Sequence, residues 1–187
     1  RFIAMLDDLA VDTIYCRGKM YDDQIEHYSM MYKTDHRWAT EAGFYAYGVL
    51  ENYIVSKTGC KIDERISDMD NYTITKYKNW HLGSRGQRTG RYYAGIDDFD
   101  LITPNFDTKI QNDSGTVGTM QDLVINMEPL SKKQYTSRYT YDYVLGRSLG
   151  HYTNLDCQND IKVLFVTDSF GEAVSPYLIM GFKSEER

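Results

Sequence analysis

Residues Lys162 to Gly171 read KVLFVTDSFG, and this stretch decides the fold class. Its first part, Lys162–Val166, is a short continuous apolar run, which is typical of a strand buried on both faces of a parallel sheet. A second apolar stretch, Ala173–Phe182, predicts a helix with Pro176 in its first turn, where a missing N–H costs little. A strand, a tight turn and a helix in this order predict an α/β fold with a parallel sheet core and a site where the strand ends.

Another helix is predicted over Glu41–Lys57, because its apolar residues recur at helical spacing. Thr40 is expected to cap its N-terminus, and Gly59 to end it. The end of a further helix is expected at Phe2–Leu9, and a glycine-rich basic loop at Gly83–Gly90. Short strands are expected at Val11–Tyr15, Tyr72–Tyr77, Leu123–Asn126 and Tyr139–Val144, the last of which could equally be a surface loop.

Length and composition predict a single globular domain over residues 1–187. The chain has 187 residues, of which 42% are hydrophobic and 26% charged, so it can bury a real core. Its net charge of −6 argues against nucleic-acid binding. No apolar stretch reaches the roughly 20 residues of a membrane helix. The chain begins with Arg1 and is expected to be a piece of a longer protein.

The cysteine and tyrosine contents narrow the possible classes of protein further. The three cysteines (Cys16, Cys60 and Cys157) have no CxxC spacing, which excludes a disulfide scaffold and a zinc knuckle and allows one bridge at most. Tyrosine is abundant, with 17 residues. Such amphipathic rings suit polar, sugar-facing clefts, and they serve equally well as core residues.

Ser169 is the candidate nucleophile. It lies in the turn between the predicted strand and helix, where its hydroxyl would be exposed and its backbone N–H could donate to a developing oxyanion. Serine esterases and acyltransferases use such a turn. A serine that merely caps the helix explains the local pattern equally well.

The second candidate site is the segment Thr34–Trp38, which reads TDHRW and comes directly before the predicted long helix. A serine nucleophile needs a base, and the base needs a carboxylate that orients it. Asp35 and His36 supply these two groups within one short loop. The alternative is a capping aspartate beside an exposed histidine.

These segments together resemble the bacterial DHHW proteins, relatives of the alginate O-acetylation proteins within the SGNH-hydrolase-like superfamily. The blocks that carry the resemblance are YKTDHRW (32–38), EAGFYAY (41–47), GSRGQRTG (83–90), GIDDF (95–99), ITP (102–104), VTDSFG (166–171) and PYL (176–178). In this order they cover most of the chain from about Tyr28 onward.

The resemblance implies an SGNH-like fold with a circularly permuted block order and a chain truncated at its C-terminus. It makes Asp35 the orienting acid and Ser169 the nucleophile. The family's base position falls on Arg37, which stays protonated and cannot act as a base. Either the loop is rearranged so that His36 turns toward Ser169, or the triad is broken. Arg37, Trp38 and Asp168 are expected to contact substrate, unless Arg37 pairs with Asp35 or Asp168 instead.

The function implied is an exported cell-envelope carbohydrate O-acyltransferase or esterase that needs no metal and no other cofactor. A carbohydrate or cell-envelope polysaccharide and a membrane-bound acyl-donor protein are the expected partners, and the location is extracytoplasmic. The alternative is a catalytically impaired pseudoenzyme that binds glycan or helps to assemble the envelope. Arg37 favours this alternative, whereas the DSFG turn favours the enzyme.

Overall fold

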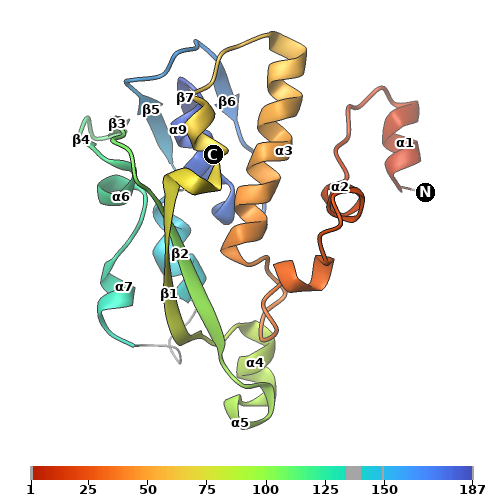
Figure 1. The fold of residues 1–187 in the computed structure, drawn as a ribbon, viewed down its shortest axis with the longest axis vertical. Helices are drawn as coiled ribbons and strands as arrows, with labels where there is room; N and C mark the ends of the chain where they lie inside the picture. Colours follow the sequence, from red (N-terminus) through yellow and green to blue (C-terminus); the bar gives the residue numbers. More distant parts are fainter. Residues whose placement is uncertain (1, 134–139, 149, 187) are drawn as a thin grey trace.

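Two sheets and one long helix organise the molecule (Figure 1). The computed structural model describes residues 2–133, 140–148 and 150–186. Strands β1 (Tyr72–His81) and β2 (Asp97–Pro104) form an antiparallel pair. The second sheet has the strand order β4-β3-β5-β7-β6. Its members are β3 (Ile110–Asn112), β4 (Val117–Gly118), β5 (His151–Asn154), β6 (Lys162–Leu164) and β7 (Ser184–Glu186).

The helices are mostly short. They are α1 (Phe2–Asp8), α2 (Cys16–Asp22), α3 (Thr40–Thr58), α4 (Ser84–Thr89), α5 (Arg91–Ala94), α6 (Met120–Leu123), α7 (Glu128–Ser131), α8 (Thr140–Leu145) and α9 (Ser175–Gly181). Single turns of 3-10 helix are η1 (His27–Met30), η2 (Glu64–Ile66), η3 (Met69–Asn71), η4 (Gly146–Ser148) and η5 (Ser169–Ala173). No helix in these described ranges is both long and apolar enough to cross a membrane.

The long helix α3 confirms the prediction from periodicity, with one correction at its start. Gly59 ends the helix in the left-handed conformation, with φ of 67°, as predicted. The N-cap is Ala39 and not Thr40. Thr40 lies within the first turn, and its hydroxyl donates to the carbonyl of Asp100 on β2 over 2.5 Å. The threonine therefore fastens the helix to the hairpin strand.

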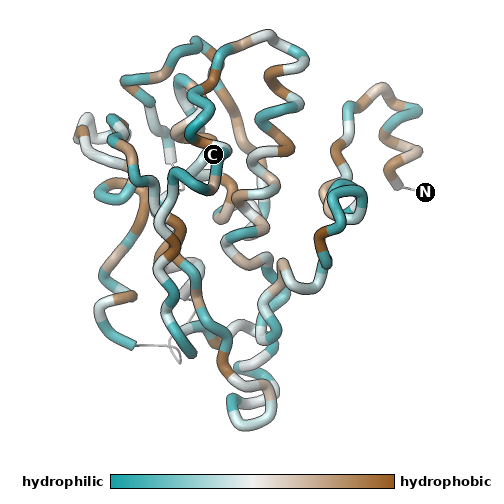
Figure 2. Tube along the Cα trace, in the orientation of Figure 1, coloured by the Kyte–Doolittle hydropathy of each residue, from teal (hydrophilic) through white to brown (hydrophobic). Residues whose placement is uncertain are grey.

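The core lies between α3, α9 and the inner faces of both sheets. Phe44 and Tyr177 pack edge to face, with ring centroids 5.1 Å apart, and Tyr72 joins them from β1. The buried tyrosines are Tyr32, Tyr47, Tyr72, Tyr141, Tyr152 and Tyr177. Figure 2 shows hydrophobic segments along these inner elements and hydrophilic ones in the outer turns. Much of the tyrosine therefore serves the core.

The strand that decided the fold class is shorter and more exposed than predicted. Only Lys162–Leu164 forms β6, which lies at the edge of its sheet and pairs in parallel with β7 alone. Leu164 is 71% exposed and Val166 87% exposed, so one face of the run is open. The other described strand pairs are antiparallel, so the parallel core is present only as this pair. The helix α9 follows with Pro176 at its start, as predicted.

Four local predictions were wrong or incomplete. No strand forms at Val11–Tyr15, whose end residues are half exposed. Leu123–Asn126 continues from α6, with Val124 and Ile125 buried without strand pairing. Helix α8 replaces the strand expected at Tyr139–Val144, of which Tyr139 lies outside the described residues. The loop expected at Gly83–Gly90 is helix α4. Short apolar runs do not distinguish strand from helix, and tertiary packing decided each case.

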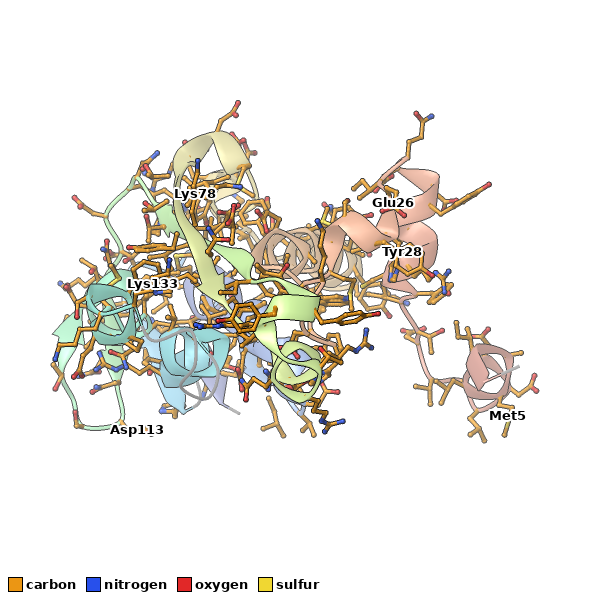
Figure 3. All side chains as sticks on the ribbon, turned by 90° about the horizontal axis from the view of Figure 1, so that it is seen from below. Met5, Glu26, Tyr28, Lys78, Asp113 and Lys133 are labelled. Atoms are coloured by element: carbon orange, nitrogen blue, oxygen red, sulfur yellow. The ribbon has the colours of Figure 1, made fainter. Side chains whose placement is uncertain are left out.

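The N-terminal helices lie to one side of the main body. Figure 1 shows α1 and α2 beyond α3, and Figure 3 places Met5 well away from the sheets. Hydrogen bonds tie the residues on either side of α2 to α3, from the Tyr45 hydroxyl to Asp23 over 2.6 Å and from the Tyr53 hydroxyl to Asp12. Cys16, Cys60 and Cys157 are all free thiols.

Candidate functional site

The loop that carries Asp35 is pinched at its base. Met31 and Trp38 form an isolated antiparallel bridge, and the Ala39 N–H donates to the Met30 carbonyl over 2.8 Å. The chain between them turns sharply, so Asp35 and His36 do not point to opposite sides as neighbours on an extended strand would.

Thr34 anchors this loop through its hydrogen bonds. Its N–H and its hydroxyl both donate to the Asp97 carboxylate, over 2.8 and 2.7 Å. Its hydroxyl oxygen accepts the Gly83 N–H, and its carbonyl accepts the Gly86 N–H over 2.8 Å. Two distant segments therefore hold the loop in one position.

Gly83 is needed for this close approach. A Cβ at Gly83 would lie 2.2 Å from the Cβ of Asp35, so no larger residue fits without moving the backbone. Close packing against Asp35 therefore explains the glycine that opens the sequence block GSRGQRTG (83–90).

The Asp35 carboxylate lies at the centre of the site and is fully buried. Its Oδ1 accepts the His36 N–H over 2.8 Å and the Ser84 hydroxyl over 3.0 Å. Its Oδ2 lies 3.1 Å from His81 Nε2 and 3.2 Å from Arg37 Nη1. Each oxygen therefore has at least two polar partners, as a buried carboxylate requires.

These partners keep Asp35 ionised. Burial by itself would raise the pKa of the carboxyl group. The hydrogen bonds from His81 and the His36 N–H, together with the Arg37 charge, outweigh burial and lower that pKa well below its usual value. Asp35 is thus a fixed negative charge at any physiological pH.

The His36 ring is oriented through its Nδ1 atom. Its Nδ1 lies 2.9 Å from Asp35 Oδ1 and 3.0 Å from the Ser84 hydroxyl. A carboxylate beside Nδ1 favours the tautomer with the proton there, which leaves the Nε2 lone pair available. The side chain is 43% exposed, so the ring is accessible from outside.

The turn that carries Ser169 lies against this loop. The ring of Phe170 packs on His36 and Trp38, with centroid distances of 6.1 and 5.5 Å. Asp168 caps η5 by accepting the Phe170 N–H over 3.0 Å. Among the described residues, neither the hydroxyl nor the N–H of Ser169 has a hydrogen-bond partner, and no hydrogen bond joins it to His36. The two distant stretches therefore meet in space, with the serine unengaged.

A glycine on α3 sets the position of this turn. A Cβ at Gly43 would lie 2.3 Å from the Ala173 Cβ and 2.4 Å from the Ala173 carbonyl oxygen. We expect Gly43→Ala to destabilise the protein by about 1–3 kcal/mol, because the η5 backbone must move. Chemical denaturation measures this loss. Gly48→Ala on the same helix, where an added Cβ meets nothing, is the control and is expected to be neutral or slightly stabilising.

Trp38 and Arg37, two further predicted site residues, differ in their exposure and contacts. Trp38 is partly exposed and supports Phe170. Arg37 is only 8% exposed; it reaches Asp35, and its guanidinium carbon lies 5.5 Å from the Tyr141 ring centroid. The predicted alternative in which Arg37 pairs with Asp35 is found.

Two members of the site, His81 and Ser84, are not among the predicted site residues. His81, for which the sequence blocks suggest no role, is fully buried, lies 4.4 Å from the Tyr32 ring between centroids and binds Asp35. A bulge in β1, where Asn79 has φ of 52°, precedes it. Ser84 begins α4, which was expected to be a loop. Within the described ranges, no group of three or more His, Cys, Asp or Glu side chains could hold a metal ion.

Comparison with known proteins gives matches in structure. No family model and no curated protein sequence matches the chain. Two structures of Bacillus cereus PatB1 are similar. One has a TM-score of 0.58 at 23% identity, over 83% of this chain and 52% of PatB1. The other, with a sulfonyl adduct, has a TM-score of 0.62 at 24% identity, over 89% of this chain and 55% of PatB1.

A DHHW family protein from Eubacterium siraeum is similar as well, with a TM-score of 0.55 at 14% identity over 83% of this chain and 49% of that protein. The chain therefore spans about half the length of the structures it matches. At these identities the likeness concerns the fold, and the fold confirms the resemblance to the DHHW proteins that the sequence blocks indicated.

Proposed function

We propose that the Asp35 loop and the Ser169 turn form the active site of a carbohydrate O-acyltransferase or esterase with a serine nucleophile. One observation carries the proposal: Phe170 packs against His36, whose Nδ1 lies 2.9 Å from the buried carboxylate of Asp35. An oriented imidazole beside an unengaged serine is the arrangement that nucleophilic acyl transfer requires.

In the first half of the reaction Ser169 takes the acyl group. Its hydroxyl oxygen attacks the acyl carbonyl while its proton passes to His36 Nε2. The free N–H of Ser169 donates to the oxyanion of the tetrahedral intermediate. Collapse of this intermediate breaks the bond to the leaving group, which takes the proton back from His36, and the acyl group stays on Ser169.

In the second half a sugar hydroxyl or a water molecule attacks the acyl-serine. His36 removes the proton of the attacking group and returns it to Ser169 as the ester bond breaks. A sugar acceptor makes the reaction an O-acyl transfer, and water makes it a hydrolysis. Asp35 stays ionised throughout and stabilises the protonated imidazole.

The Arg37 side chain has a supporting role in this scheme. Its charge and the His81 hydrogen bond lower the pKa of Asp35, although burial opposes them. We propose that His36 replaces the base that the family places at position 37. Trp38 and Asp168 frame the turn, and we propose that their exposed edges contact the substrate.

The domain, location and partners that we propose follow from the resemblance to the DHHW proteins. We propose that residues 1–187 belong to a single SGNH-hydrolase-like domain with permuted block order. We also propose that it works outside the cytoplasm on a cell-envelope polysaccharide, with acyl groups from a membrane-bound donor protein. The fold shared with PatB1 and the DHHW protein over about half their length supports this setting.

A glycan-binding or envelope-assembly pseudoenzyme is the second candidate. The observation that favours it is the arginine at position 37, which binds Asp35 Oδ2 where the family pattern would place the base. In that case the site would bind glycan without reacting.

Labelling with a fluorophosphonate probe and with a sulfonyl fluoride tests the enzyme. Such reagents react with activated serines, and PatB1 has been solved with a sulfonyl adduct. We expect the full chain to be labelled and Ser169→Ala to lose the label.

Ser56→Ala, an exposed serine on α3, is the matched control and should label like the wild type. A Ser169→Ala protein that still takes up the label would remove Ser169 as the nucleophile. Folded wild-type protein that neither reagent labels would favour the pseudoenzyme.

A further inference from the structure

The segment between the two long strands carries a charge opposite to that of the whole protein. From Leu82 to Ile96 there are three arginines and no aspartate or glutamate, whereas the chain has a net charge of −6. We call Arg85, Arg88, Arg91, Tyr92 and Tyr93 the arginine–tyrosine tip. All five side chains are exposed.

The tip is convex and projects from the body. Figure 1 shows α4 and α5 beyond the end of the β1–β2 pair, and Figure 2 shows this end as largely hydrophilic. Tyr92 is 92% exposed and Tyr93 87% exposed. Gly90 and Gly95 bound α5 with φ of 85° and 75°, so the aromatic pair is held in a tight turn.

The arginines and the tyrosine rings of the tip lie close to one another. Arg85 and Arg88 lie three residues apart on α4 and therefore share a face. Arg91 lies over the Tyr92 ring, with its guanidinium carbon 4.9 Å from the centroid, and donates to the Tyr92 hydroxyl over 3.0 Å. The tip thus presents cations beside amphipathic rings.

We propose that the arginine–tyrosine tip docks on an anionic phospholipid surface. Tyrosine rings favour the headgroup level of a bilayer, and arginines bind anionic headgroups there. A tip that projects from the body suits a flat surface better than a single glycan chain. The negative charge of the remaining protein would be repelled by the same surface, so docking has one orientation.

Docking at the tip would bring the candidate site close to the membrane. Ser84, the first residue of α4, donates to Asp35 Oδ1, and Gly86 donates to the Thr34 carbonyl. The tip is therefore rigidly joined to the loop of Asp35 and His36. The proposal does not depend on the serine chemistry, because lipid binding requires neither Ser169 nor His36.

Co-sedimentation with phosphatidylcholine vesicles, with and without phosphatidylglycerol, tests the proposal. The full chain is expected to sediment only with the anionic vesicles, and Ser169→Ala should do the same. The triple variant Arg85→Gln, Arg88→Gln and Arg91→Gln is expected to lose about a hundredfold in partitioning, since each arginine near such a surface is worth about fivefold.

The matched control removes three exposed lysines elsewhere, as Lys61→Gln, Lys109→Gln and Lys162→Gln, and should keep the binding. Tyr92→Ser with Tyr93→Ser should weaken binding even at high salt. Absence of vesicle binding by the wild type would overturn the proposal, as would an equal loss in the lysine control. Tip-dependent retention on heparin without vesicle binding would assign the tip to a soluble polyanion instead.

Discussion

Asp35→Asn is expected to lower the free energy of unfolding by about 3–5 kcal/mol. The substitution keeps the shape of the side chain but removes the charge that Arg37 and His81 face inside the protein. The NH₂ group of the asparagine would also replace one of the two acceptor oxygens and would face hydrogen-bond donors there. Removing the anion from a buried, hydrogen-bonded ion pair is among the costlier single changes in a protein.

The loss can be measured by urea denaturation at neutral pH. Asp70→Asn, at an exposed aspartate, is the control and should change stability by less than about 0.5 kcal/mol. A loss below about 1 kcal/mol for Asp35→Asn would mean that the carboxylate does not hold the site together.

The same carboxylate predicts a pH dependence of stability. Burial opposes ionisation, but the His81 and His36 hydrogen bonds and the Arg37 charge lower the pKa of folded Asp35 below that of the unfolded chain. Its contribution to stability is therefore complete above about pH 4 and falls as the pH drops through the lowered value. Wild-type stability should decline in this acid range more steeply than that of Asp35→Asn. Parallel declines would contradict the low pKa.

The parts of the fold that the sequence predicted share a strong local signal. Helix α3 has a long apolar periodicity and a glycine at its end, and α9 has a proline at its start. The strand at Tyr72–Tyr77 was confirmed as part of the longer β1. In each of these, local preference and tertiary packing agree.

The missed elements lack such a signal. Gly83–Gly90 looks like a loop by its glycines, yet Gly83 and Gly86 are required for close approach to Asp35 and Thr34, and the residues between them form a helical turn. The exposed face of β6 was missed because an apolar run does not say which neighbours cover it.

Part of the candidate site could be predicted from the sequence, and the rest depends on the tertiary structure. The chemistry of a serine nucleophile and the family resemblance paired Asp35 and His36 with Ser169, and the packing of Phe170 on His36 brings these stretches together. His81 could not be found this way, because it lies 46 residues from Asp35 and follows a bulge that the sequence does not mark. That Arg37 cannot act as a base follows from its residue type and stays a prediction, whereas its burial against Tyr141 depends on the assembled core.

The proposed catalytic role of His36 predicts the largest kinetic effect. His36→Ala is expected to lower the rate constant for fluorophosphonate labelling of Ser169 by about 10²–10⁴-fold, the usual worth of a general base. Stability should change little, because the ring is 43% exposed and lies at the rim of the site.

His151→Ala is the matched control for this change. Its Nδ1 lies 3.1 Å from the Asp113 carboxylate, so it forms a similar histidine–aspartate pair, and its ring is 46% exposed. His151 lies on β5 and Asp113 directly after β3, outside the Asp35 loop, so the loss of this pair should leave labelling unchanged. If His36→Ala reacts as fast as His151→Ala, the imidazole beside Asp35 does not activate the serine. The arginine at position 37 then marks a lost base, and the cleft must act through binding.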